Sequence, residues 1–127
     1  MAKKILFIED EGALQQAISF ALEKEGYQTV SAMDGDAGIR LAAKEQPNLI
    51  LLDLILPKKN GFDVLKTLKE NPDTQRIPVM ILTNLESDAN IEQALAMGAA
   101  SYLVKANYKI EEVIQKIKTM LGEEAKR

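Results

Sequence analysis

The sequence predicts a doubly wound α/β sandwich, in which helices cover both faces of one parallel sheet. Three observations predict this fold. Five short apolar runs alternate with five segments in which apolar residues recur at helical spacing. Strict alternation of strands and helices is typical of parallel sheets. The first, third and fourth runs are almost continuously apolar, as expected of strands that are buried on both faces.

The predicted strands differ in length and polarity. The second is shorter and more polar than the others, which favours a place at an edge of the sheet. The five predicted strands are Ile5–Ile8, Thr29–Ser31, Asn48–Leu52, Pro78–Leu82 and Ser101–Val104.

The segments between the strands predict helices with one apolar stripe each. The first stripe runs from Leu14 to Leu22, and Gly26 is suited to end that helix. The last stripe runs from Ile110 to Leu121. Three weaker helices fit Asp36–Glu45, Gly61–Glu70 and Ser87–Met97, the last closed by Gly98.

Length and composition narrow the class of protein. The 127 residues suit one compact domain, and no internal repeat or linker interrupts them. We expect a single domain over residues 1–122 and a polar tail over residues 123–127, which leaves no room for an effector domain. The chain has neither Cys nor His. Disulfides, thiolate metal sites and a histidine phosphorylation site on this chain are therefore excluded.

Charge and hydropathy bear on partners and location. The net charge of −3 and the pI of about 5.1 argue against a broad basic surface, so we expect no direct contact with nucleic acid. The apolar run near the N-terminus is too short for a signal peptide, and no run approaches the ~20 residues that span a bilayer. We expect a cytoplasmic protein without a membrane segment.

Polar residues follow the predicted strands at the edge where open α/β sheets place their sites. Strand one ends in Glu9 and Asp10, strand three in Asp53, strand four in Thr83 and strand five in Lys105. Three carboxylates, a hydroxyl and an ammonium are thereby predicted to border one crevice.

Asp53 is the most informative of these residues. It interrupts the run Leu49–Leu56, in which every other residue is apolar. Burying a lone carboxylate is costly, so a functional role is favoured over that of a strand-end Asp that caps the next turn. For Glu9 and Asp10 the structural alternative is stronger than for Asp53, because Asp just before a helix is a good N-cap. Thr83 and Lys105 carry weight only as part of the joint pattern.

The acid cluster indicates metal-assisted phosphoryl chemistry. Two carboxylates at ~4 Å repel by roughly 4 kcal/mol at an effective dielectric constant of about 20, so the cluster needs compensation. Carboxylate oxygens without His or Cys favour Mg²⁺, and Lys105 supplies a further positive charge. Together with the Thr83 hydroxyl, these groups are what phosphoryl transfer requires, and Asp53 is then the carboxylate nucleophile.

These motifs resemble, over essentially the whole chain, the receiver domain of the bacterial response regulators, proteins of two-component signalling that include chemotaxis receivers. The resemblance implies a flavodoxin-like (βα)5 fold with strand order 2-1-3-4-5. The residues that carry it are Ile5–Glu11, Leu51–Pro57, Gly61, Pro78–Thr83, Gly98–Ala99 and Tyr102–Lys105.

The family implies a role for each acid. Asp10 and Asp53 would bind Mg²⁺ directly, together with the backbone carbonyl of Ile55, and Glu9 would assist through water. Asp53 would accept phosphate from a phosphohistidine on a sensor kinase or a histidine phosphotransferase.

The family also implies a conformational switch. Thr83 and Lys105 would bind the phosphoryl oxygens, and Tyr102 would swing inward once Thr83 has moved. The face made by the fourth helix, fifth strand and fifth helix would then meet a downstream protein. Tyr102 has a structural alternative as an aromatic residue at the sheet edge.

Four positions depart from the family pattern. Ala106 follows Lys105 where Pro is usual, which leaves open whether that peptide bond is cis or trans. Asn84 occupies a position that is usually small, and Ile55 and Leu85 place apolar bulk beside the site. Because these side chains do not position a water, we expect slow self-dephosphorylation.

Rival functions are weighed against this interpretation. A flavodoxin-like cofactor binder would need phosphate-cradling turns where Glu9–Glu11 would repel a phosphate. An aspartyl-phosphate phosphatase would carry D-x-D after its first strand, and an NTPase would carry a P-loop, which is absent. The runner-up is a receiver-like interaction scaffold that takes no phosphate.

Overall fold

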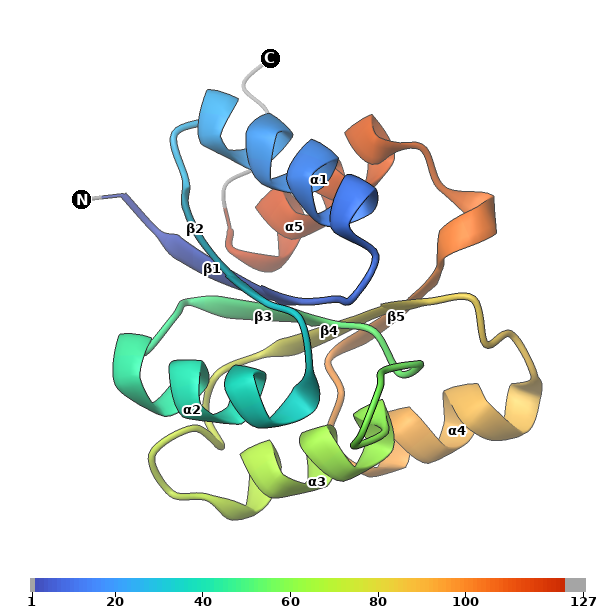
Figure 1. Ribbon diagram of the computed structural model, residues 1–127. Coiled ribbons are helices and arrows are strands. Elements are labelled where there is room, and N and C mark those ends of the chain that lie inside the picture. The colour runs from blue at the N-terminus through green and yellow to red at the C-terminus, as the bar shows by residue number, and fades with distance from the viewer. Residues whose placement is uncertain (1, 123–127) are drawn as a thin grey trace.

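The computed structural model describes residues 2–122, which form one sheet between two layers of helices (Figure 1). Helices α1 and α5 cover one face, and α2, α3 and α4 cover the other. The elements in chain order are β1 (Lys4–Ile8), α1 (Gly12–Lys24), β2 (Gln28–Ala32), α2 (Gly35–Glu45), β3 (Leu49–Leu52), α3 (Gly61–Glu70), β4 (Val79–Thr83), α4 (Asp88–Ala96), β5 (Ser101–Val104), the 3₁₀ turn η1 (Lys105–Asn107) and α5 (Ile110–Met120).

The sheet confirms the predicted fold class. All neighbouring strands pair in parallel, in the order β2-β1-β3-β4-β5. The polar second strand lies at an edge, as predicted, because an edge strand makes fewer demands for burial. The predicted α3 and β5 agree with the structure at both ends, and the other elements differ by one or two residues.

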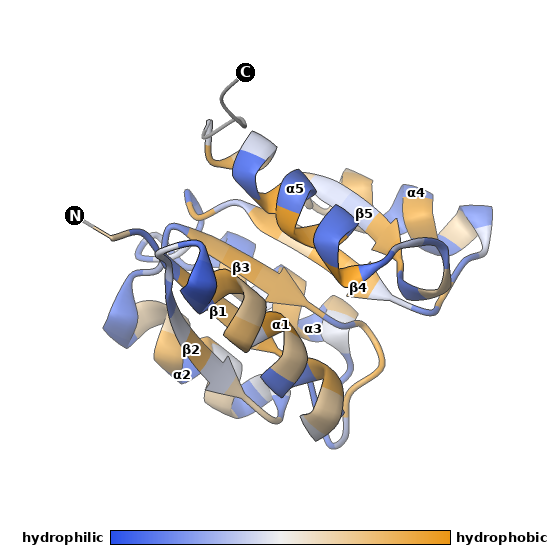
Figure 2. Cartoon of the chain, turned by 90° about the horizontal axis from the view of Figure 1, so that it is seen from above, coloured by the Kyte–Doolittle hydropathy of each residue, from blue (hydrophilic) through white to orange (hydrophobic). Residues whose placement is uncertain are grey.

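Alternation along the strands divides the apolar residues between two cores. Ile5 and Phe7 of β1 pack toward α1 and α5, whereas Leu6 and Ile8 pack toward α2, α3 and α4. Figure 2 shows β1, β3 and β4 as mostly hydrophobic, while the helices carry hydrophilic segments. Successive side chains of a strand point to opposite faces, so a strand covered on both sides must be apolar at every position.

Local sequence explains where the helices start and stop. The side chains of Asp34, Asn60 and Ser87 accept hydrogen bonds from backbone N–H groups in the first turns of α2, α3 and α4. Gly26 and Gly98 follow α1 and α4 with φ of 93° and 106°, the left-handed conformation that favours glycine at a helix end. Both helix stops agree with the predictions.

The structural alternative for Asp10, that it is the N-cap of the first helix, is wrong. The N-cap of α1 is Glu11, and its side chain makes no capping hydrogen bond. Asp10 is therefore not placed there to begin the helix.

Two further predictions concern the C-terminal polar tail and the absence of a membrane-spanning segment. The polar tail expected over residues 123–127 lies outside the described residues. Within residues 2–122, no helix combines the length and the hydrophobicity that crossing a bilayer requires.

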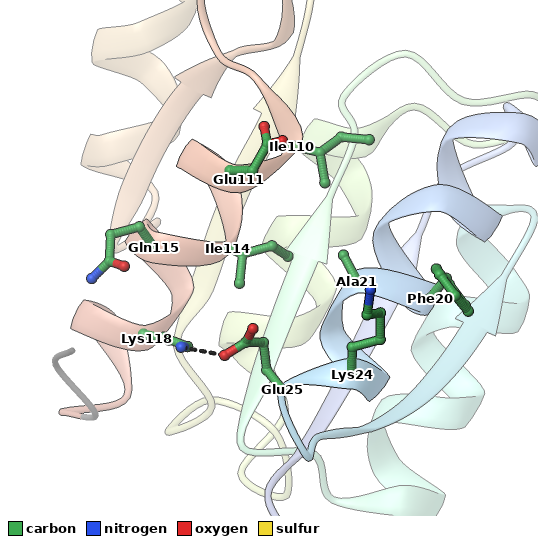
Figure 3. A pocket seen from close by; sticks show the side chains of 9 residues that line it. All are labelled: Phe20, Ala21, Lys24, Glu25, Ile110, Glu111, Ile114, Gln115 and Lys118. Carbon is green, nitrogen blue, oxygen red and sulfur yellow. Dashed lines mark ion pairs between the residues drawn. The ribbon is translucent and has the colours of Figure 1, made fainter. Parts of the chain in front are cut away.

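Helices α1 and α5 lie side by side and leave a groove of about 490 Å³ between them (Figure 3). Ala21 and Ile114 line it, and an ion pair between Lys118 and Glu25 crosses it. Phe20 on α1 is 65% exposed beside the groove, with the Lys24 ammonium 5.5 Å from the centre of its ring. None of these residues belongs to the strand ends described below.

The start of α3 lies against the chain just after β3, and this contact requires a glycine. A Cβ at Gly61 would lie 2.3 Å from the Cα of Leu54 and 2.5 Å from the backbone oxygen of Asp53. The N–H of Gly61 donates to the Leu54 carbonyl at 2.9 Å. Because the clashing atoms are backbone, they cannot move without displacing Asp53.

We expect Gly61→Ala to lower the free energy of unfolding by about 1–3 kcal/mol, the usual cost of overpacking. Gly12→Ala is the matched control, because a Cβ at Gly12 meets nothing within 4 Å. The control should gain about 0.4–1 kcal/mol by restricting the unfolded chain. Urea unfolding of the two variants measures both effects, and equal changes would contradict the close contact.

Candidate functional site

The predicted polar residues gather at the carboxyl ends of four adjacent strands. Glu9 follows β1, Asp53 follows β3, Thr83 ends β4 and Lys105 follows β5. Ile8 pairs with Leu52, so Glu9 and Asp53, the next residue of each strand, lie side by side. The N–H of Asp53 donates to the Ile8 carbonyl at 3.1 Å, which fixes its backbone against β1.

Three carboxylates converge there. Glu9, Asp10 and Asp53 each offer one oxygen, and these oxygens lie within 4.8 Å of one another. Glu9 is fully buried, Asp53 is 3% exposed and Asp10 faces solvent. The cluster thus has a buried floor of two acids and one acid at its mouth.

Lys105 partly neutralises the two buried carboxylates, Glu9 and Asp53. Its Nζ lies 3.0 Å from Asp53 Oδ2 and 2.8 Å from Glu9 Oε1. The exposed Glu11 contributes a longer contact, with Oε1 at 3.7 Å from the same Nζ. Three ionised carboxylates of the cluster and one ammonium leave two negative charges uncompensated, which is the condition that favours a divalent cation.

The pKa values reflect this crowding. Burial raises the pKa of Glu9 above 4.5, and the charge of Asp53 adds to the rise, although Lys105 and the N–H of Glu11 oppose it. Burial alone would lower the pKa of Lys105, but its bonds to Glu9 and Asp53 outweigh that effect and raise the pKa. Lys105 therefore stays charged at any physiological pH.

Backbone N–H groups orient the two buried carboxylates. The N–H of Ile55 donates to Asp53 Oδ1 at 3.1 Å, and the N–H of Glu11 donates to Glu9 Oε2 at 3.0 Å. Asp53 therefore does cap the turn after β3, as its structural alternative predicted, and it does so with only one oxygen. The other oxygen faces Lys105.

Thr83 and Tyr102 lie on the opposite face of the sheet from Phe7 and Leu82. Thr83 shares its strand face with Val79 and Ile81, whose core Tyr102 also contacts. Thr83 is buried, and its Oγ1 accepts a 3.5 Å hydrogen bond from the Leu85 N–H.

The hydroxyl of Tyr102 donates to the Leu85 carbonyl at 2.6 Å. Burial and the charge of Asp53 raise the pKa of the tyrosine hydroxyl. Thr83 and Tyr102 thus bind the N–H and the carbonyl of the same residue, Leu85, in the β4–α4 loop. The sequence contained no signal for this role of Leu85.

The peptide bond between Lys105 and Ala106 is trans, as are all peptide bonds within residues 2–122. Lys105 begins η1 directly after β5, and its ammonium reaches back over the strand ends. The sequence had left the isomer open.

The donor set fits a hard divalent cation. The three oxygens are all carboxylate, two of them are held by the fold, and the third is accessible from solvent. Mg²⁺ prefers oxygen ligands and commonly keeps several waters, which the open side at Asp10 accommodates. The predicted contribution of the Ile55 carbonyl stays a prediction.

Comparisons with known proteins agree with this geometry. The family model for the response regulator receiver domain matches residues 5–118. The chain is 39% identical over 118 residues to the DNA-binding dual master transcriptional regulator RpaA of a Synechocystis species, an alignment that covers 93% of this chain and 48% of the relative. The chain spans about half, or less, of the length of the curated relatives it matches.

Solved structures share the fold over nearly the whole chain. The BeF3-activated N-terminal receiver domain of Klebsiella pneumoniae RstA superposes with a TM-score of 0.84 at 31% identity, covering 93% of this chain and 97% of that chain. The Mn²⁺-bound form of the response regulator Rcp1 gives a TM-score of 0.82 at 31% identity, covering 98% and 97%.

The raised pKa of Glu9 predicts how stability depends on pH. Below pH 4.5 the carboxyl is protonated in the folded and the unfolded protein, so it contributes nothing. As the pH rises from 4.5 through the folded-state pKa, ionisation costs stability. We therefore expect metal-free Glu9→Gln to be more stable than the wild type at pH 7, with the gain disappearing below pH 4.5.

Urea unfolding in EDTA between pH 4 and 8 measures this difference. Glu45→Gln is the control of opposite sign, because the hydrogen bond from Lys4 lowers the pKa of Glu45. That variant should lose stability at pH 7 and approach the wild type at low pH. A loss of stability at pH 7 for Glu9→Gln would show that its ion pair outweighs its burial.

Proposed function

The chain belongs to the response regulator receiver domain family, and from this premise we propose that it is a switch activated by phosphorylation of Asp53. The observation that carries the proposal is the buried Asp53 carboxylate, one oxygen of which faces an ammonium and lies in a cluster of uncompensated negative charge. Such a carboxylate can act as a nucleophile, and its product can be stabilised by the Lys105 ammonium.

Asp10 and Asp53 are the residues that would hold Mg²⁺, with the Ile55 carbonyl as a third ligand and Glu9 acting through water. When bound, the ion supplies charge neutralisation for the phosphoryl oxygens. Glu9 is held in an ion pair with Lys105, whose Nζ lies 2.8 Å from Glu9 Oε1.

The donor is a phosphohistidine on a sensor kinase or a histidine phosphotransferase. A carboxylate oxygen of Asp53 attacks phosphorus, the P–N bond to the imidazole breaks, and the imidazole nitrogen keeps the electron pair and takes up a proton. Lys105 then follows the negative charge from the carboxylate to the phosphoryl oxygens. As a member of the receiver domain family, the chain is not a classical enzyme. Self-phosphorylation from small donors would use the same residues as transfer from phosphohistidine.

The switch acts through Thr83 and Tyr102. The phosphoryl group brings about −1.5 to −2 charges and three acceptor oxygens, which attract the Thr83 hydroxyl. Thr83 then releases the Leu85 N–H, and the β4–α4 loop moves. Tyr102 leaves the Leu85 carbonyl and turns into the vacated space. The surface of α4, β5 and α5 changes shape, and a downstream protein binds the new shape.

We expect incubation with acetyl phosphate and Mg²⁺ to add one phosphoryl group to the protein, seen by intact mass spectrometry. Asp53→Asn should abolish the adduct, and EDTA should suppress it. Asp63→Asn, which removes an exposed carboxylate on α3, should leave it unchanged. An adduct that survives Asp53→Asn would move the acceptor elsewhere, and no adduct on the wild type would favour the scaffold function.

The aspartyl phosphate should persist for minutes or longer once the donor is removed. Ile55 is half exposed and Leu85 flanks the site, and neither side chain can orient an attacking water. Ile55→Asn should therefore shorten the lifetime, and Met33→Asn, which also replaces an exposed apolar residue, should not. Loss of phosphate from the wild type within seconds in Mg²⁺ would contradict this.

A further inference from the structure

Gln15 is a buried polar residue of α1 that the acid chemistry does not use. Its side chain is 7% exposed, although α1 otherwise buries apolar residues. The amide nitrogen Nε2 donates two hydrogen bonds, to the carbonyls of Glu9 and Ala32, each at 3.1 Å. Both protons of the amide are therefore committed to backbone.

These two carbonyls lie where the strands β1 and β2 separate. The N–H of Glu9 donates to the Ala32 carbonyl at 2.9 Å, one residue beyond the paired Ile8 and Ala32. After this point the chain leaves β1 for α1, and the sheet supplies no further partner. Gln15 replaces the missing strand contacts and holds the two strand ends together.

The Glu9 carbonyl belongs to the peptide unit that joins Glu9 to Asp10. Two of the three carboxylates of the cluster thus project from either side of the peptide unit that Gln15 holds. The Asp10 side chain is exposed, and within residues 2–122 no hydrogen bond or ion pair holds its carboxylate. Its direction therefore depends on the backbone from which it projects.

We propose that Gln15 is a positioning residue of the cation site, which sets the directions of Glu9 and Asp10 by fixing the peptide between them. The inference rests on the proposed Mg²⁺ site and adds to it a residue that contacts neither metal nor phosphate. Glutamate at this position would face two carbonyls with acceptors only. An aliphatic residue would remove the donor to the Glu9 carbonyl and would leave the Ala32 carbonyl with the N–H of Glu9 alone.

The experiment compares Gln15→Met with Thr74→Val in the full chain. Met keeps the length of the side chain and removes both donors. Thr74 is the matched control, because its buried hydroxyl also donates to a backbone carbonyl, that of Leu68 at 2.7 Å, in the segment between α3 and β4. Mg²⁺ dissociation constants come from calorimetric titration, and unfolding midpoints from urea titration without metal.

We expect Gln15→Met to weaken Mg²⁺ binding about tenfold, at the lower end of the effect of residues that orient metal ligands, and Thr74→Val to leave it within about twofold. In the metal-free protein, hydrogen exchange of the Glu9 amide should accelerate in Gln15→Met and not in Thr74→Val. The second measurement does not depend on metal.

Each outcome decides the inference. Weaker binding and faster exchange confined to Gln15→Met support it. If wild type and Gln15→Met bind Mg²⁺ equally, the role of Gln15 is overturned and the Mg²⁺ site stands. The same conclusion follows if Thr74→Val loses as much Mg²⁺ affinity as Gln15→Met at a similar loss of stability. A wild type that takes up no Mg²⁺ at millimolar concentration overturns both the cation site and the role of Gln15.

Discussion

The structure at the strand ends depends on one electrostatic arrangement, in which a single ammonium lies between two buried carboxylates. Lys105 contacts Asp53 and Glu9 at 3.0 and 2.8 Å, and a third acid, Asp10, lies at the mouth. One cation cannot neutralise three anions, two of which are buried. The site therefore favours the binding of a further cation.

The fold tolerates the buried acids because the residues that stabilise it and the acids lie in different parts of the strands. Apart from Lys4 at the start of β1 and Thr83 at the end of β4, every residue of β1, β3 and β4 is apolar, and the acids appear only after β1 and β3 end. Two hydrophobic cores of comparable extent pack against the two faces of the sheet. The free energy gained by burying their apolar side chains offsets the unfavourable burial of the acids. At Gly61, the start of α3 lies directly against the backbone of Asp53 and Leu54.

Strand alternation also separates Asp53 from the proposed readout residues Thr83 and Tyr102. The side chains of Leu49 and Leu51 lead to Asp53 on the face covered by α1 and α5, whereas Thr83 and Tyr102 contact the core beneath α2, α3 and α4. Leu85 connects Thr83 with Tyr102 through its backbone, since its N–H donates to Thr83 and its carbonyl accepts from Tyr102. Leu85 thus links the end of β4 to β5.

The sequence by itself determined the fold class, the position of all five strands and the identity of the clustered acids, because these depend on local periodicity and on which residue follows each apolar run. It placed α3 and β5 at their observed bounds. Tertiary structure alone decided which charges pair: Lys105 and Asp53 are 52 residues apart, and Glu11 entered the site unpredicted. It also made Glu11, rather than Asp10, the N-cap of α1, and it gave Gln15 and Leu85 their contacts. These are distances between residues from different strands and helices, and only the packing of those elements sets them.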